Sequence, residues 1–101
     1  MANQTIRPLI EEAVKVSMKN RDKETTSALR MAISELKKEE IDKQIELEDE
    51  QVIQILQRMI KQRKDSFSQF EQAGREELAE KEAREISILE KFYRNMKTTT
   101  K

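Results

Sequence analysis

Only one glycine and one proline interrupt the 101 residues of this chain, and this scarcity is the strongest constraint on its fold. A β-sheet needs tight turns between its strands, and such turns are built from clusters of Gly, Pro, Asn and Asp. Glu, Lys, Arg, Gln, Leu, Met and Ala dominate instead, and these residues favour helices. The apolar residues recur at steps of three and four, which a disordered chain would not show. The sequence therefore predicts an all-α protein.

Four helical segments follow from this periodicity, at about residues 6–20, 23–41, 48–73 and 76–96. Thr5 and Asp22 are the expected N-caps of the first two, and a loop is expected over about residues 42–47. The expected apolar face of the first helix consists of Ile6, Ile10, Ala13, Val14 and Ser17, widened by Leu9 and Val16, and that of the second consists of Leu29, Ile33 and Leu36, flanked by Ala28, Met31 and Ala32. The expected face of the third helix consists of Val52, Ile55, Leu56, Met59, Ile60, Phe67 and Phe70. That of the fourth consists of Leu78, Ile88, Leu89, Phe92 and Met96, joined by Ala79 and Tyr93.

Gly74 is expected to end the third helix, because glycine readily adopts the left-handed conformation found at many helix C-termini. The break it makes is short, so the third and fourth helices should form a long antiparallel hairpin. The fold expected is a four-helix multihelical bundle built around this hairpin. Residues 1–97 should form a single helical domain, and residues 98–101 a disordered tail.

The chain contains no histidine and no cysteine, which removes the commonest general base and the commonest metal ligands. Glycine-rich phosphate loops and nucleophile motifs are missing too. We therefore expect a non-catalytic protein with no metal and no cofactor. No apolar run approaches the ~20 residues of a membrane span, and residues 1–9 lack the apolar core of a signal peptide. A cytoplasmic, unprocessed protein without membrane contact is the expectation.

Charged side chains make up 40% of the chain in equal numbers of each sign. The many carboxylate pairs are best explained as solvated helix faces. The densest basic stretch is formed by Arg58, Lys61, Arg63 and Lys64. Arg58, Lys61 and Lys64, together with Arg75, are candidate contacts for phosphate or for a partner. The alternative is an ordinary charged face. Lys91 to Lys97 is also basic, and it is better explained by the dipole at a helix C-terminus than by nucleic-acid binding.

Arg63 falls on the apolar face of the third helix, and Glu82 and Glu85 fall on that of the fourth. Charged residues are seldom placed there unless they are paired. Counted from Gly74, Arg63 and Glu85 lie at equal distances along the two arms of the hairpin. We expect Arg63 to pair with Glu85, or otherwise with Glu82, through a planar guanidinium that can hold a carboxylate bidentately. Such a pair would fix the register of the hairpin.

Residues 61–75 read Lys-Gln-Arg-Lys-Asp-Ser-Phe-Ser-Gln-Phe-Glu-Gln-Ala-Gly-Arg and are followed by Leu78 and a Glu-Lys-Glu run. This stretch resembles the signature of the GatB/YqeY family. Leu29-Arg30-Met31, residues 47–50 and residues 88–90 extend the resemblance over about residues 6–92. In two places the chain departs from the family pattern. Glu48 stands where a Thr or Ser cap is usual, and Tyr93-Arg94 replaces a Leu-Pro step that leads into a second small domain.

The resemblance implies the first, helical domain of the family alone. The family is similar to the C-terminal part of the B subunit of glutamine-dependent aminoacyl-tRNA amidotransferase, whose active sites lie in other domains and subunits. The implied role is a non-catalytic module that is accessory to tRNA-dependent amidation, a carbon–nitrogen ligation with glutamine as amide donor. It would act by docking to a partner protein or, weakly, to tRNA. The alternative is a free-standing helical protein-interaction module with no tRNA role.

Overall fold

The computed structural model describes residues 6–99, and describes side chains through residue 94. It contains four helices, namely α1 (Ile6–Lys19), α2 (Lys23–Lys43), α3 (Asp49–Gln72) and α4 (Glu76–Thr99), and the described residues include no strand. The predicted all-α fold is confirmed. α2 runs two residues further than expected, and α4 continues through Thr99 into the predicted tail. Thr5 and residues 100–101 lie outside the described residues, and the division into domain and tail stays a prediction.

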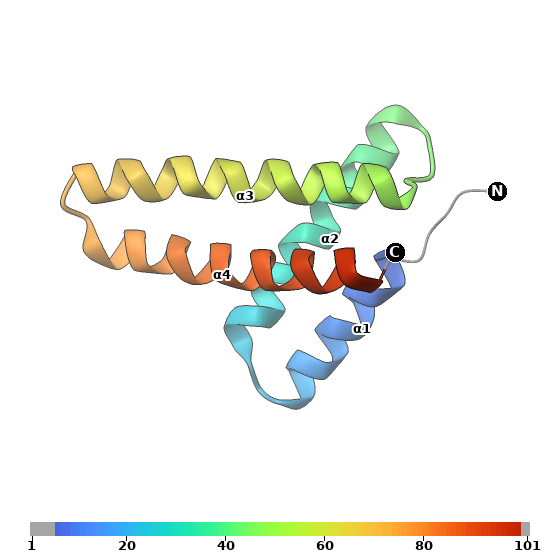
Figure 1. Cartoon of the computed structure of the whole chain (residues 1–101), viewed down its shortest axis with the longest axis horizontal. Coiled ribbons are helices and arrows are strands. Elements are labelled where there is room, and N and C mark those ends of the chain that lie inside the picture. Colours follow the sequence, from blue (N-terminus) through green and yellow to red (C-terminus); the bar gives the residue numbers. More distant parts are fainter. Residues whose placement is uncertain (1–5, 100–101) are drawn as a thin grey trace.

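The dominant packing in the molecule is the antiparallel pair of α3 and α4, as predicted (Figure 1). α1 and α2 form a second pair, joined by a short corner at residues 20–22. α2 crosses the α3–α4 hairpin and contacts both of its helices, while α1 also contacts α3. The Gly74 end of the hairpin projects beyond α1 and α2, which gives the molecule its elongated extents of 48 × 31 × 26 Å.

One apolar core joins all four helices. Its buried members include Ile6, Ile10 and Val14 of α1, Leu29, Ala32 and Leu36 of α2, Val52, Ile55, Leu56, Met59 and Ile60 of α3, and Ile86 and Leu89 of α4, with Leu47 from the loop before α3. Phe67 of α3 and Phe92 and Tyr93 of α4 are partly buried against it. Met96 lies beyond the described side chains.

The expected apolar faces are wrong at four positions, which are Leu9, Val16, Met31 and Leu78. Leu9 and Val16 of α1 were placed beside the core but are 37% and 47% exposed. Leu78 of α4 is 38% exposed, whereas Ile86, which was not predicted to face the core, is buried. The core-facing positions of α4 run 79, 82, 86, 89 and 93 at alternating steps of three and four, so Leu78 is displaced by about 100° around the helix.

The helix ends follow local rules. The Asp22 carboxylate accepts hydrogen bonds from the backbone N–H of Thr25 at 3.2 Å and from its hydroxyl at 2.6 Å, as a helix N-cap should. These bonds hold the pKa of Asp22 below its ordinary value. At α3, Gln51 compensates for the missing Thr or Ser cap, because its side chain accepts from the backbone N–H of Glu48 at 2.9 Å.

Gly74 has φ = +72°, the left-handed conformation that was predicted for the turn between α3 and α4. A Cβ added there would meet no heavy atom within 4 Å, so backbone strain alone opposes substitution. Gly74→Ala is expected to lower the free energy of unfolding by about 1–2 kcal/mol. Chemical denaturation measures this loss, and Gly74→Asn should lose less because asparagine tolerates the same conformation. Equal losses for the two variants would show that the strain is not the cause.

Candidate functional site

The described surface contains an open groove of about 750 Å³, which is shaped by α1, α2 and α3. One face of α2, from Lys23 to Glu35, supplies its length. The corner between α1 and α2 closes one end, and Met59, Gln62 and Arg63 of α3 form a wall. Arg30 and Met31 of one segment that carries the family resemblance, and Gln62 and Arg63 of another, therefore line the same groove although they lie far apart in the sequence.

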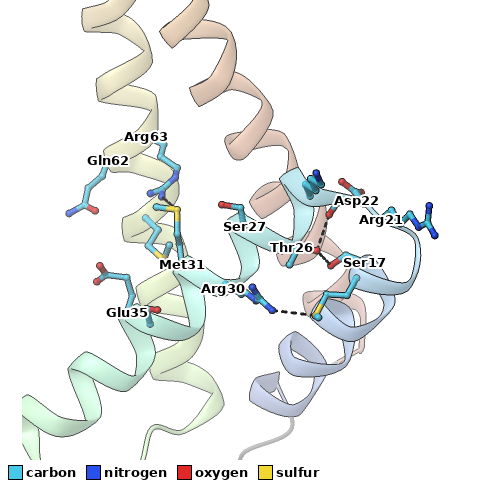
Figure 2. Close-up of a pocket in the computed structure, with 14 residues that line it drawn as sticks. Ser17, Arg21, Asp22, Thr26, Ser27, Arg30, Met31, Glu35, Gln62 and Arg63 are labelled. Atoms are coloured by element: carbon cyan, nitrogen blue, oxygen red, sulfur yellow. Dashed lines mark hydrogen bonds between the residues drawn. The ribbon is translucent and has the colours of Figure 1, made fainter.

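Two guanidinium groups contact two thioethers in the groove. Nη2 of Arg30 lies 3.4 Å from the Met18 sulfur, which links α2 to α1, and Nη2 of Arg63 lies 3.5 Å from the Met31 sulfur, which links α3 to α2. Figure 2 shows Arg30 extended towards α1, and Met31 next to Arg63. Met18 and Met31 are 51% and 41% exposed, so both offer apolar surface to a ligand. Met31 thus lies in the groove and not at the flank of the core, where its spacing on α2 had placed it.

A small network of hydrogen bonds links α1 to α2 at the corner formed by residues 20–22. Ser17 is buried, and its hydroxyl donates to the carbonyl oxygen of Val14 at 2.8 Å. The same hydroxyl shares a hydrogen bond of 2.6 Å with Thr26 of α2, whose hydroxyl lies 2.9 Å from the carbonyl oxygen of Asp22. α1 and the first turn of α2 are thereby joined by side chains as well as by the chain between them.

Arg63 reaches α4 at the height expected from the sequence. Its Nε lies 2.9 Å from Oε2 of Glu85, and the two side chains are 12% and 15% exposed. The geometry differs from the expected bidentate fork, because Nη2 turns to the Met31 sulfur. Arg63 of α3 thus contacts Glu85 of α4 and Met31 of α2 with the same side chain. Its role in fixing the register of the hairpin stays a prediction.

Glu82 lies one turn before Glu85 on α4 and is partly buried. Burial and the charge of Glu85 raise the pKa of Glu82 above its ordinary value of 4.5, against weaker opposing effects of Arg63 and Lys81. An acid whose pKa is raised by folding stabilises the protein most at low pH, and this contribution is lost as the pH rises through the folded pKa.

Glu82→Gln should therefore raise the melting temperature at neutral pH, because it removes a charge that the fold disfavours. The gain should shrink on acidification and vanish below the ordinary glutamate pKa, where Glu82 is protonated in the folded and the unfolded protein. Thermal melts of the two proteins across this pH range test the sign. A gain that persists in acid, or a loss at neutral pH, would contradict the assignment.

The four candidate contacts for phosphate or a partner are only partly brought together. Arg58, Lys61 and Lys64 follow one another at three-residue steps along α3, whereas Arg75 lies in the turn beyond Gly74. Nη2 of Arg58 is 3.9 Å from Oε1 of Glu39, and Nζ of Lys64 is 3.0 Å from Oε2 of Glu90. Two of the four charges are therefore opposed by carboxylates, and none of the four lines the groove.

Two interactions of Asp49 and Arg7 were missed by the sequence analysis. Asp49 is 7% exposed, and its carboxylate accepts a hydrogen bond of 2.8 Å from the backbone N–H of Ile6. A side chain in the first turn of α3 therefore provides the hydrogen-bond acceptor for a backbone N–H that has no partner within α1. Arg7 forms an ion pair with Glu40 of α2. Burial alone would raise the pKa of Glu40, but hydrogen bonds from Arg7 and from the backbone N–H of Leu47 lower it below its ordinary value. Sequence spacing carries no signal for contacts between distant helices.

Among the described residues, no three or more acidic side chains lie together in an arrangement that could hold a metal ion. None of the described helices is long and apolar enough to cross a membrane. The groove is lined by guanidinium, ammonium, hydroxyl, amide and thioether groups. It also contains two carboxylates, Glu35 and the N-cap Asp22.

Known proteins resemble this chain over most of its length. A protein named "Altered inheritance of mitochondria protein 41, mitochondrial" from Kluyveromyces lactis is 36% identical over 84 residues, which are 82% of this chain and 45% of that protein. The protein of the same name from Clavispora lusitaniae is 37% identical over 77% of this chain and 44% of its own length. An uncharacterised protein of Schizosaccharomyces pombe is 33% identical over 86% of this chain and 71% of its own.

This chain thus spans less than half of either mitochondrial relative. Their names point away from the cytoplasmic location expected from the sequence, and that expectation is wrong. It rested on the lack of an apolar signal peptide, which says nothing about mitochondrial import, because transit peptides are amphipathic rather than apolar. The family model for YqeY-like proteins matches residues 7–98, which include all of the groove. The chain belongs to the YqeY-like protein family.

Proposed function

We propose that the chain is a non-catalytic docking module that is accessory to tRNA-dependent amidation, in which it contacts a protein partner. The link to amidation comes from the resemblance to the B subunit of the glutamine-dependent amidotransferase. The observation that supports docking is the groove, because residues of two separate family-like segments, Arg30 and Met31 of one and Gln62 and Arg63 of the other, line the same exposed hollow. Arg30 and Met31 in particular do little for the core, since both are exposed.

A protein partner is favoured over tRNA by the state of the basic residues on α3. Lys64 and Arg58 face carboxylates of α4 and α2, and displacing those carboxylates would offset part of any gain from binding phosphate. The chain has no net charge to attract a polyanion from a distance. The same observations favour a second candidate function, a free-standing protein-interaction module with no role in amidation.

Addition of the chain to a purified glutamine-dependent amidotransferase tests the proposal against this second candidate. Amide formation on misacylated tRNA is measured with the enzyme alone, with the chain alone and with both. The proposal expects no turnover by the chain alone and a changed kcat or KM for tRNA in the mixture. An unchanged rate at a saturating excess of the chain would favour the second candidate. Turnover by the chain alone, lost on a point substitution in it, would overturn the non-catalytic role.

Direct binding of tRNA is expected to be weak and sensitive to salt. Only a few phosphates can be contacted by Lys61, Arg75 and the partly engaged Arg58 and Lys64, so few counterions are released. Fluorescence anisotropy with labelled tRNA at two salt concentrations measures this. Submicromolar affinity that survives moderate salt would show that tRNA itself is the partner.

A further inference from the structure

We propose that the groove between α1, α2 and α3 binds an acidic, amphipathic helical segment of a partner protein. This inference rests on the docking role in the proposed function and specifies the chemistry of the partner. It follows from three properties of the groove, which are its length, its thioether surface and its excess of uncompensated cations.

The length of the groove matches a short helix. Its α2 wall extends from Lys23 to Glu35, which at 1.5 Å per residue is about 18 Å, or roughly three helical turns. The wall residues recur at steps of three and four, so a single straight face of α2 is presented. Helix-in-groove recognition uses apolar anchors at this same spacing on the bound segment.

The apolar surface of the groove comes from methionine. Met18 and Met31 are about half exposed on its two sides, and Met59 is buried beneath. Thioether side chains are flexible and polarisable, and they suit surfaces that must fit the side chains of a partner. No aromatic side chain lines the groove, so it lacks the stacking platform with which proteins hold unpaired bases. Apolar protein side chains fit this surface better than RNA does.

The charge balance of the groove favours an acidic partner. Arg21, Lys23 and Arg30 line it, and none of the three contacts a carboxylate of residues 6–94 within ion-pair distance. Nη2 of Arg30 has a sulfur atom as its neighbour, which is a weak acceptor for a charged donor. Arg63 is engaged by Glu85, and Asp22 by the cap of α2. Asp22 keeps its negative charge while it caps α2, so Asp22 and Glu35 together oppose the three cations, and the groove keeps a net positive charge in a chain that is neutral overall.

An unbiased peptide selection tests the inference. Random 16-residue peptides are displayed and selected on the intact chain, and an enriched peptide is then synthesised with a fluorescent label. The inference expects enriched sequences with net negative charge and apolar residues at steps of three and four. Failure to enrich any peptide, or enrichment of neutral or basic sequences, would overturn it.

Matched variants then locate the binding. Arg30→Glu should weaken binding of the labelled peptide by about tenfold or more, and Met31→Gln should weaken it less but clearly. Lys38→Glu makes the same charge change at an exposed position of α2 outside the groove, and it should change the affinity less than about twofold. Arg63 is left intact because its loss is expected to destabilise the fold. Melting temperatures equal to that of the parent show that the variants are folded.

Three results would count against the groove as an acidic-helix site. Equal effects of Arg30→Glu and Lys38→Glu would mean that the peptide binds elsewhere or only through net charge. Displacement of the peptide by micromolar tRNA would assign the groove to nucleic acid, and loss of binding through self-association of the chain would assign it to a second copy. If the peptide binds as expected and amidation is unaffected by the chain, the groove inference holds and the proposed function fails.

Discussion

Arg63→Ala is expected to lower the free energy of unfolding by about 3 kcal/mol, because it leaves Glu85 charged and largely buried without its partner. The same substitution removes the contact between the Arg63 guanidinium and the Met31 sulfur, so α2 also loses a neighbour. For a chain of this size the melting temperature should fall by roughly 12 °C or more. Thermal melts and urea denaturation followed by circular dichroism measure the loss.

Lys64→Ala is the matched control for Arg63→Ala. It removes a positive charge one residue away, from an ion pair with Glu90 in which the side chains are 57% and 39% exposed. Exposed pairs contribute about 0–1 kcal/mol, so this variant should melt close to the parent. A double-mutant cycle of Arg63→Ala with Glu85→Ala should give a coupling energy above about 1 kcal/mol. Coincident melts of the two single variants, or a coupling near zero, would remove the role of the pair in the hairpin register.

Leu89→Ala should cause a loss of similar or larger size, about 2–5 kcal/mol. Leu89 is 1% exposed and belongs to the core that all four helices share. Its truncation removes apolar contacts and leaves a cavity that a close-packed core fills only in part. The midpoint of urea unfolding should shift while the dependence on urea keeps its slope, which indicates that stability rather than the extent of unfolding has changed.

Leu78→Ala provides the comparison on the same helix. Leu78 is 38% exposed, so its truncation removes less buried surface and leaves no enclosed cavity, and it should cost about 1 kcal/mol or less. The two leucines are the same residue type with the same helix propensity, so their difference reports the burial of each face of α4. Similar losses for the two variants would mean that Leu78 faces the core, as the sequence analysis had expected.

The register of the α3–α4 hairpin was predictable from the sequence because it depends on local quantities. Gly74 fixes where the chain reverses, and the constant rise of a helix then sets which residues of the two arms stand at equal height. Arg63 and Glu85 were matched by this count alone, and their atoms lie in contact. The apolar faces of α2, apart from Met31, and of α3 followed in the same way from periodicity.

The face of α4 and the groove depend on how helices cross, which periodicity does not specify. Leu78 and Ile86 lie on neighbouring faces of α4, which are one residue apart in the helical repeat. Which of these two faces is buried depends on where α2 crosses the hairpin and packs against α4. The groove likewise exists because α1 and α3 lie on either side of one face of α2. Asp49 reaches Ile6 across forty-three residues, a separation at which sequence patterns carry no signal.

The overhang of the α3–α4 hairpin has a consequence for amide hydrogen exchange. The buried residues of α3 end at Ile60, although the helix continues to Gln72, and Phe67 and Phe70 beyond it are only partly buried. Each arm near Gly74 therefore has the other as its one neighbour (Figure 1). Segments with so little buried surface open at a small fraction of the global free energy. Protection of the backbone amides should thus decline along α3 from Leu56 to Gln72 and rise again along α4 towards Leu89.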